Sequence, residues 1–199
     1  MDSRINFAIK VRSLKNFVAV HDARKQFYAS IRKNTLSVEA QKPQMMESFR
    51  KFKALYPPLR FPDVYFVIGA FTSGGTATQK GLLIGLDQTV RTPDIPQDEL
   101  TLWQKNNFND LASIPNLVAH ELIHFNQDNL AGDTTLLKSV LVEGMADFIG
   151  YLISGKSANE RLHVWARGKE KEVWAAFDIL NIKDYKSFYE KSGAGKMFK

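Results

Sequence analysis

Residues 116–127 read NLVAHELIHFNQ and place two of the four histidines of the chain one helical turn apart. On an α-helix, residues four positions apart share a face with their Cβ atoms about 5–6 Å apart, so His120 and His124 can converge on one ion. Zinc binds histidine nitrogen and, where one position is kept for water, needs one further protein ligand. Glu121 borders the same face, where it could act as a base. Because short motifs recur by chance, the motif alone leaves a metal site and an ordinary helix both open.

A second apolar segment of helical period, VLVEGMADFIGYL at residues 140–152, carries two acidic residues one turn apart. Acidic side chains are uncommon on buried faces unless they are paired or bind a metal. Glu143 could therefore supply the third zinc ligand. Asp147 could accept the outward N–H of a zinc-bound histidine and fix its tautomer. The alternative is that Glu143 and Asp147 form a solvated stripe on this helix.

The linker DNLAGDTT at residues 128–135 separates the two apolar segments. Gly132 can end the first helix, and Asp133 or Thr134 can cap the second. A linker this short favours two antiparallel helices packed as neighbours, over residues 116–131 and 134–154.

The succession of HELIH and EGMAD resembles the HExxH…ExxxD pattern of gluzincin zinc metallopeptidases. The resemblance implies zinc ligands at His120, His124 and Glu143, a general base at Glu121 and an orienting acid at Asp147. A narrower similarity covers roughly residues 60–180. It connects the stretches VYFVIGAFTSGG, GLLIGLD, NLVAHELIHFNQ, VEGMADF and WARGKEKEVWAAF with a bacterial family of predicted zinc-dependent proteases that includes the GldB gliding-motility lipoproteins.

The rest of the sequence predicts a helix-dominated α+β fold. Apolar residues recur at helical spacing from about residue 11 to 32 and from 45 to 55. DVYFVIGAF and GLLIGLDQTV are β-rich and predict a hairpin or two neighbouring strands within residues 63–90. A helix is expected to start near Pro96 with acidic residues in its first turn, and another to span residues 158–180 with Trp165 and Trp174 on its buried side. The gluzincin resemblance implies a zincin-like arrangement, in which GLLIGLD either lines the substrate cleft or merely covers the helices.

The function predicted from these residues is zinc-dependent hydrolysis of a peptide or protein substrate, with Zn²⁺ as the cofactor. Glu121 would take the proton of the attacking water and pass it to the leaving amine. The oxyanion that develops on the peptide carbonyl needs a hydrogen-bond donor besides zinc. Five residues downstream of the ligands are candidates: Tyr151, His163, Arg167, Tyr185 and Tyr189. Among them we favour His163, because it can donate when protonated. Gln127 follows His124 by three residues and either borders the site or is purely structural.

Composition limits the rival functions. The 199 residues are 44% hydrophobic and contain no cysteine, so they predict a single domain over residues 1–199 whose metal ligands come from histidine and carboxylate. The net charge of +6 is dispersed along amphipathic segments, and we expect no nucleic-acid partner. No stretch is long enough in apolar residues for a membrane span. The oligomeric state stays open. A zinc-binding structural or partner-binding component without turnover is the main alternative to an enzyme.

The two ends of the sequence depart from the resembled family. That family is expected to begin with a lipoprotein signal and to continue past the Trp-containing helix, whereas this chain opens at MDSRIN and stops at KSGAGKMFK. Either the sequence is a fragment of a longer protein or it is a shorter variant. The family resemblance implies a lipoprotein of the cell envelope if an N-terminal signal has been removed.

Overall fold

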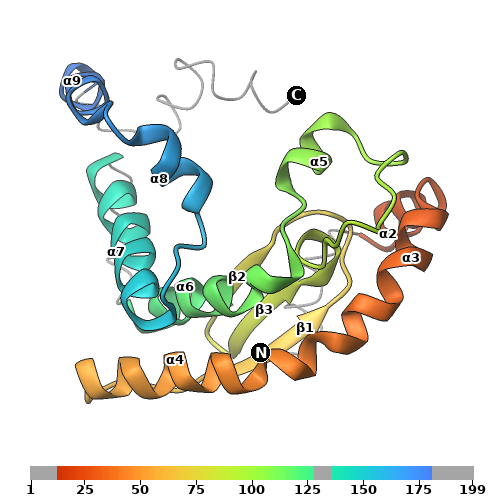
Figure 1. The fold of residues 1–199 in the computed structure, drawn as a ribbon, viewed down its shortest axis with the longest axis horizontal. Helices are drawn as coiled ribbons and strands as arrows, with labels where there is room; N and C mark the ends of the chain where they lie inside the picture. The colour runs from red at the N-terminus through yellow and green to blue at the C-terminus, as the bar shows by residue number, and fades with distance from the viewer. Residues whose placement is uncertain (1–12, 128–135, 181–199) are drawn as a thin grey trace.

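The fold is known from a computed structural model that describes residues 13–127 and 136–180. The described part is a helix-dominated α+β structure with one small sheet, as the sequence predicts (Figure 1). Its helices are α2 Leu14–Asp22, α3 Lys25–Leu36, α4 Lys42–Leu55, α5 Leu102–Asn107, α6 Ile114–Asn126, α7 Leu136–Ser154, α8 Glu160–Ala166 and α9 Glu170–Leu180. Its strands are β1 Asp63–Val67, β2 Gly75–Thr78 and β3 Gly81–Gly85.

The sheet has the order β1-β3-β2, so β3 is the central strand. β1 and β3 are parallel neighbours, and β2 and β3 form the antiparallel hairpin. The segment TSGGTATQK at residues 72–80, which separates the two β-rich runs in the sequence, contains strand β2. The β-rich runs DVYFVIGAF and GLLIGLDQTV are therefore neighbours and not a hairpin. All five residues of β3 are buried, which matches its unbroken apolar run GLLIG.

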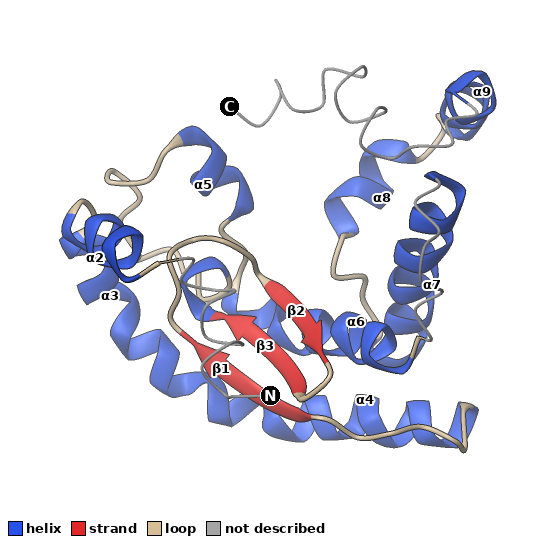
Figure 2. Cartoon of the chain, turned by 180° about the vertical axis from the view of Figure 1, so that it is seen from behind, coloured by secondary structure: helices blue, strands red, loops and turns tan. Residues whose placement is uncertain are grey.

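Helix α6 joins the sheet to the other helices. It packs on β2 and β3 and also on α4 and α7. Figures 1 and 2, seen from opposite sides, show the three strands side by side, with α6 between this sheet and α7. A single apolar cluster fills the space between them, with Ile31, Leu82, Ile84, Val118 and Leu122 fully buried at its centre. The HELIH helix is thus a core element.

Two predictions near the N-terminal helices are wrong. The helix predicted over residues 11–32 is broken between α2 and α3, and no helix begins near Pro96, since α5 starts only at Leu102 behind a Thr101 capping box. The reason is tertiary. The Glu99 carboxylate, expected in the first turn of its own helix, accepts a hydrogen bond from the Phe27 backbone N–H in the first turn of α3 at 2.8 Å.

The helix predicted over residues 158–180 is also wrong as a single element. It is divided into α8 and α9 around Gly168, whose φ of +80° lies in the left-handed region that glycine favours. Trp165 and Trp174, expected on a buried side, are 59% and 71% exposed. Among the described residues, no helix is both long and apolar enough to cross a membrane.

Candidate metal centre

Helix α6 holds the two histidines inside the fold. Pro115 stands in its first turn, where a missing N–H costs no hydrogen bond, and the helix then buries its apolar residues against the sheet. The prediction that this helix runs to residue 131 is wrong, because α6 ends at Asn126 and Gln127 has an extended backbone. The proposed caps Gly132, Asp133 and Thr134 lie outside the described residues. His120 is buried and His124 is partly exposed one turn further on.

Helix α7 lies antiparallel to α6, as predicted. The Gln127 side chain donates to the Val142 carbonyl at one end of the contact, while Gly150 lies against the backbone of His120 at the other. A Cβ at Gly150 would stand 3.4 Å from Cα and N of His120, which is ordinary van der Waals contact, so the site has little room for a side chain larger than a methyl group. The packing turns Glu143 towards the two histidines of α6.

Three potential ligands meet between these helices. His120 Nε2 lies 3.0 Å from His124 Nε2, and Glu143 Oε2 lies 3.5 Å and 3.4 Å from the same two nitrogens. Ligand atoms about 2.0–2.1 Å from a tetrahedral zinc stand roughly 3.3–3.4 Å apart, so the three separations fit a common zinc ion. Among the described residues, this is the cluster of histidine and carboxylate groups with metal-ligand spacing.

An oxygen lies 2.8 Å from the outward nitrogen of each imidazole, in a hydrogen bond at His124 and in an ion-pair contact at His120. His120 Nδ1 lies 2.8 Å from the Asp147 carboxylate, and His124 Nδ1 lies 2.8 Å from Gln127 Oε1. A carboxylate and an amide oxygen can only accept, so each Nδ1 carries the proton. Each Nε2 then presents a lone pair, next to the Glu143 carboxylate. Three electron-rich atoms converge without a donor among them, and a cation is what such an arrangement favours.

The pKa values reflect this convergence. Burial lowers the pKa of His120, but its contacts with Asp147 and Glu143 outweigh burial and raise that pKa to about 9. The pKa of His124 is also raised, since Glu143 and Gln127 outweigh its burial. The contacts with His120 and His124 hold the pKa of Glu143 well below its usual range. Without a metal, a proton held among the three groups takes the place of the cation.

Glu121 lies beside this cluster on the side of α6 that faces the sheet. It is buried, and its charge contributes to the raised pKa of His120. Its carboxylate packs against Gly75 so closely that any Cβ at that position would overlap it. Gly75 belongs to β2, an edge strand of the sheet. Of the two alternatives for GLLIGLD, the one in which it lines a cleft as an edge strand does not apply, because that segment is the central strand β3.

The structure places the predicted oxyanion donors differently. His163 Nε2 lies 3.2 Å from Asp147 Oδ2, so His163 contacts Asp147 and not the three potential ligands. Tyr151 is about half exposed on α7 and Arg167 ends α8. Tyr185 and Tyr189 lie outside the described residues.

The sequence analysis missed one residue of this network, Asn159. Its Nδ2 donates to Asp147 Oδ1 at 2.8 Å, so the acid is held by Asn159 as well as by His120 and His163. Asn159 precedes α8 and is twelve residues from Asp147. No spacing rule connects a residue in that position with the HELIH helix. Only the turn between α7 and α8 brings it there.

The fold and this cluster define a helix-dominated α+β protein with a candidate metal centre on two packed helices. Comparison with known proteins adds the family. The family model described as gliding motility protein GldB matches residues 5–182, and the chain belongs to that family. No curated protein and no solved structure matches the chain.

Proposed function

We propose that this protein is a zinc-binding, partner-binding component of a gliding-type assembly of the cell envelope. Three findings support the proposal: membership of the GldB family, the cluster of His120, His124 and Glu143, and an apolar surface on the outer side of α7. The name of the family model also supports a lipoprotein location in the envelope.

The observation that carries the proposal is an apolar stripe on α7. Its members are between 48% and 63% exposed and are spaced by four, four, three and four residues, which places them on one helical face: Leu137, Leu141, Met145, Phe148 and Leu152. Glu143 and Asp147 point the other way, towards α6. A continuous apolar face in contact with water is a feature of interaction sites. The stripe is suited to an apolar face of a partner protein.

Zinc would connect this stripe to the core. His120 and His124 belong to α6 and Glu143 to α7, so one ion bound by all three would cross-link the two helices. When bound, zinc supplies strong ligand bonds and Lewis acidity. Asp147 and Gln127 hold the imidazole rings in the orientation that the ion requires. In this function, the metal centre fixes the direction in which α7 presents its stripe.

Metal analysis tests the zinc site. The purified chain should contain about one zinc ion, and His124→Ala should contain almost none because it lacks one of three protein ligands. His163→Ala is the matched control, because His163 contacts Asp147 and none of the three ligands. Negligible zinc in wild type and His124→Ala alike would refute the zinc site.

A second experiment tests the partner surface. The double variant Leu141→Ser, Phe148→Ser should keep its zinc and its fold but lose the stoichiometric complex that wild type forms in its native cells. Leu55→Ser is the control, since Leu55 is also largely exposed but lies at the end of α4. If the double variant is recovered in the same complex as wild type, the stripe is not the partner surface.

Peptide hydrolysis is the second candidate function, and the position of Glu121 favours it. A purely structural zinc site needs no base, yet this carboxylate is buried next to His120 and against β2. Glu121 would accept the proton of an attacking water and deliver it to the leaving amine. The edge strand β2 could hold an extended peptide by main-chain hydrogen bonds. His163 stays the candidate donor for the oxyanion, positioned through Asp147.

The variant Glu121→Gln separates the two candidates. It should keep zinc and fold, and on any peptide that wild type cleaves it should be slower by about 10²–10⁴-fold, the usual contribution of general acid–base catalysis. The substrates are an unbiased peptide library, and chelator-treated protein is the blank. Zinc-loaded protein that cleaves nothing would leave only the partner-binding function. Equal cleavage by Glu121→Gln would exclude Glu121 as the base.

A further inference from the structure

Each imidazole of the candidate metal centre is oriented by a neighbour that is itself held by a third group. For His124 the neighbour is Gln127, whose Oε1 lies 2.8 Å from His124 Nδ1 and whose Nε2 donates to the Val142 carbonyl at 2.9 Å. Gln127 directly follows α6, and Val142 belongs to α7. The contacts that orient His124 therefore stay with the two helices that carry the potential ligands.

The contacts that orient His120 leave these two helices. His120 Nδ1 lies 2.8 Å from Asp147 Oδ1, and Asn159 Nδ2 donates to the same oxygen at 2.8 Å. Asn159 directly precedes α8, a helix without buried residues. The orientation of His120 therefore depends on a residue that belongs neither to α6 nor to α7.

Two donors on one oxygen fix the direction of the Asp147 carboxylate. A carboxylate oxygen offers about two acceptor sites, so His120 and Asn159 can occupy both sites of Oδ1. A carboxylate only accepts hydrogen bonds, so Asn159 must turn its amide nitrogen, and not its amide oxygen, towards Asp147. The terminal torsion of an aspartate is only broadly restricted by its own geometry, so without Asn159 the carboxylate could turn Oδ1 away from His120.

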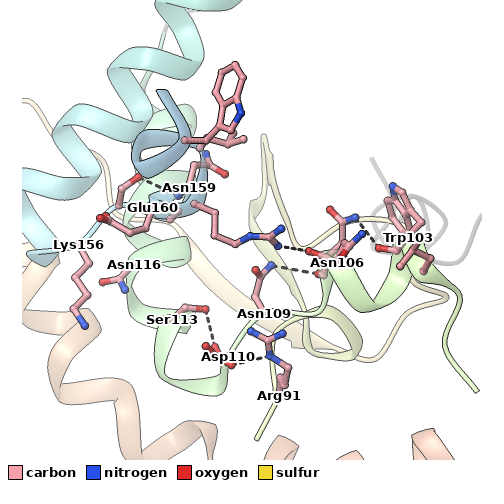
Figure 3. A pocket seen from close by; sticks show the side chains of 17 residues that line it. Arg91, Trp103, Asn106, Asn109, Asp110, Ser113, Asn116, Lys156, Asn159 and Glu160 are labelled. Carbon is pink, nitrogen blue, oxygen red and sulfur yellow. Dashed lines mark hydrogen bonds and ion pairs between the residues drawn. The ribbon is translucent and has the colours of Figure 1, made fainter. Parts of the chain in front are cut away.

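His163 contacts the same carboxylate but is easier to replace. Its Nε2 lies 3.2 Å from Asp147 Oδ2, and its side chain is 49% exposed. Water can substitute for an exposed donor at small cost. Asn159 is half-buried and has the shorter contact, and Figure 3 shows it on one wall of a pocket whose opposite wall carries Asn106 and Trp103. Asn159 is therefore the donor on which the position of Asp147 mainly depends.

We propose that Asn159 is a positioning residue of the metal centre, which holds Asp147 Oδ1 opposite His120 Nδ1 and so raises the affinity for zinc. The inference rests on the zinc site of the proposed function and applies to both of its candidate functions. A carboxylate that accepts the outward N–H of a zinc-bound histidine fixes its tautomer and increases its basicity as a ligand. Because Asn159 acts through Asp147, its loss leaves all three ligands in place and lowers the affinity without abolishing binding.

Competition for zinc between the full chain and a chromophoric chelator, at one fixed pH, tests the proposal. Asn159→Ala should weaken zinc binding by about fivefold to tenfold, the factor for losing one ordinary hydrogen bond. Asp147→Ala should weaken it by about 10–100-fold, the usual effect of removing the direct partner of a metal-binding histidine. Arg161→Ala is the matched control and should bind zinc as tightly as wild type, because Arg161 belongs to α8 but donates to the Asn106 carbonyl of α5.

A double-mutant cycle separates positioning from a structural role in α8. If Asn159 acts through Asp147, Asn159→Ala should lower the zinc affinity of wild type but change that of Asp147→Ala very little. An effect that arises from α8 alone would lower the affinity by the same factor in both backgrounds, which would overturn the proposal.

Thermal unfolding of the metal-free proteins is the folding control. Asn159→Ala should lower the Tm by no more than about 2–4 °C, the shift for one lost hydrogen bond in a chain of this size. Asn159→Ser is the second variant, because serine suits the position before a helix but its hydroxyl ends one bond short of the Asn159 amide nitrogen. It should show the same loss of zinc affinity. A larger fall in Tm in both variants would indicate a structural role and overturn the proposal.

The zinc measurement also distinguishes failure of this inference from failure of the zinc site. Equal zinc affinities of wild type, Asn159→Ala and Asn159→Ser would overturn the role of Asn159 and leave the zinc site intact. Failure of wild type to compete for zinc at all would overturn the zinc site, and the role of Asn159 with it.

Discussion

Helices α6 and α7 are both strongly apolar, but their surroundings are opposite. α6 is covered by α4, α7, β2 and β3, and every residue from Val118 to Ile123 is buried. α7 packs on α6 and α4 along one face, and its described buried residues are Leu136, Ala146, Gly150 and Ile153. Five large apolar side chains of α7, the stripe from Leu137 to Leu152, are exposed to solvent, while Asp147 is largely buried against α6 and Glu143, although 62% exposed, reaches both histidines.

This difference shows how the candidate metal centre is built. In α6 the core surrounds His120 and Glu121, which keeps these polar groups away from water. In α7 the small residues Ala146 and Gly150 are buried, so α7 can approach α6 closely enough for Glu143 to reach both histidines. An apolar helix can therefore serve either as core or as a surface that presents apolar side chains. The following predictions test this contrast, from the largest expected effect to the smallest.

The first test replaces one leucine on each helix. Leu122 of α6 is fully buried in the core cluster, and Leu122→Ala should lower the free energy of unfolding by about 2–5 kcal/mol through the cavity it leaves. Leu141 of α7 is 56% exposed, and Leu141→Ala should change it by no more than about 0.5 kcal/mol. Urea unfolding measures both. A loss at Leu141 as large as that at Leu122 would mean that α7 is also a core helix.

The second test adds volume at two glycines of α7. Valine at Gly150 would place its methyl groups against the His120 backbone, where a Cβ is already 3.4 Å from two atoms. Gly150→Val should therefore destabilise the fold by about 1–3 kcal/mol and weaken zinc binding. Gly144 has no atom within 4 Å of its would-be Cβ, so Gly144→Val should be nearly neutral. Equal unfolding curves for the two variants would contradict the close approach of α7 to α6.

The third test concerns pH in the metal-free protein. The folded-state pKa of His120 is raised to about 9, so its contribution to stability is fully present below its unfolded value near 6.5 and is lost as the pH rises to 9. We expect a loss on the order of 1 kcal/mol, or about 2–4 °C in Tm for a chain of this size. His120→Ala should show a smaller step, because only the raised pKa of His124 then remains. With zinc bound, the step should disappear, since the ion replaces the proton.

Some elements follow from local sequence alone. The i, i+4 spacing of His120 and His124 predicts a shared helical face, and the apolar run GLLIG predicts a buried strand. The acidic pair Glu143 and Asp147 predicts a second helix turned towards the first. The structure brings Glu143 to both histidines and Asp147 to His120, while zinc binding by this cluster stays a prediction.

Other elements depend on contacts between distant parts of the chain. Strand β2 is a short polar segment, GTAT, that becomes a strand only because β3 offers it a hydrogen-bonding edge. The break before α3 coincides with a contact to a distant residue. The carboxylate of Glu99, 72 residues from Phe27, accepts a hydrogen bond from the Phe27 N–H in the first turn of α3. Neither event leaves a periodic pattern in the sequence.

The sequence by itself determined which residues can form the candidate metal centre, because helical spacing places His120 and His124 on one face whatever surrounds the helix. Only the tertiary structure decided which apolar faces are buried. The hydrophobicity of a side chain determines that its burial is favourable. It does not determine whether another element is present to cover that side chain. For α6 the sheet and two helices provide that cover. For the Leu137 to Leu152 stripe of α7, the described part of the chain provides none, and the stripe is left to the proposed partner.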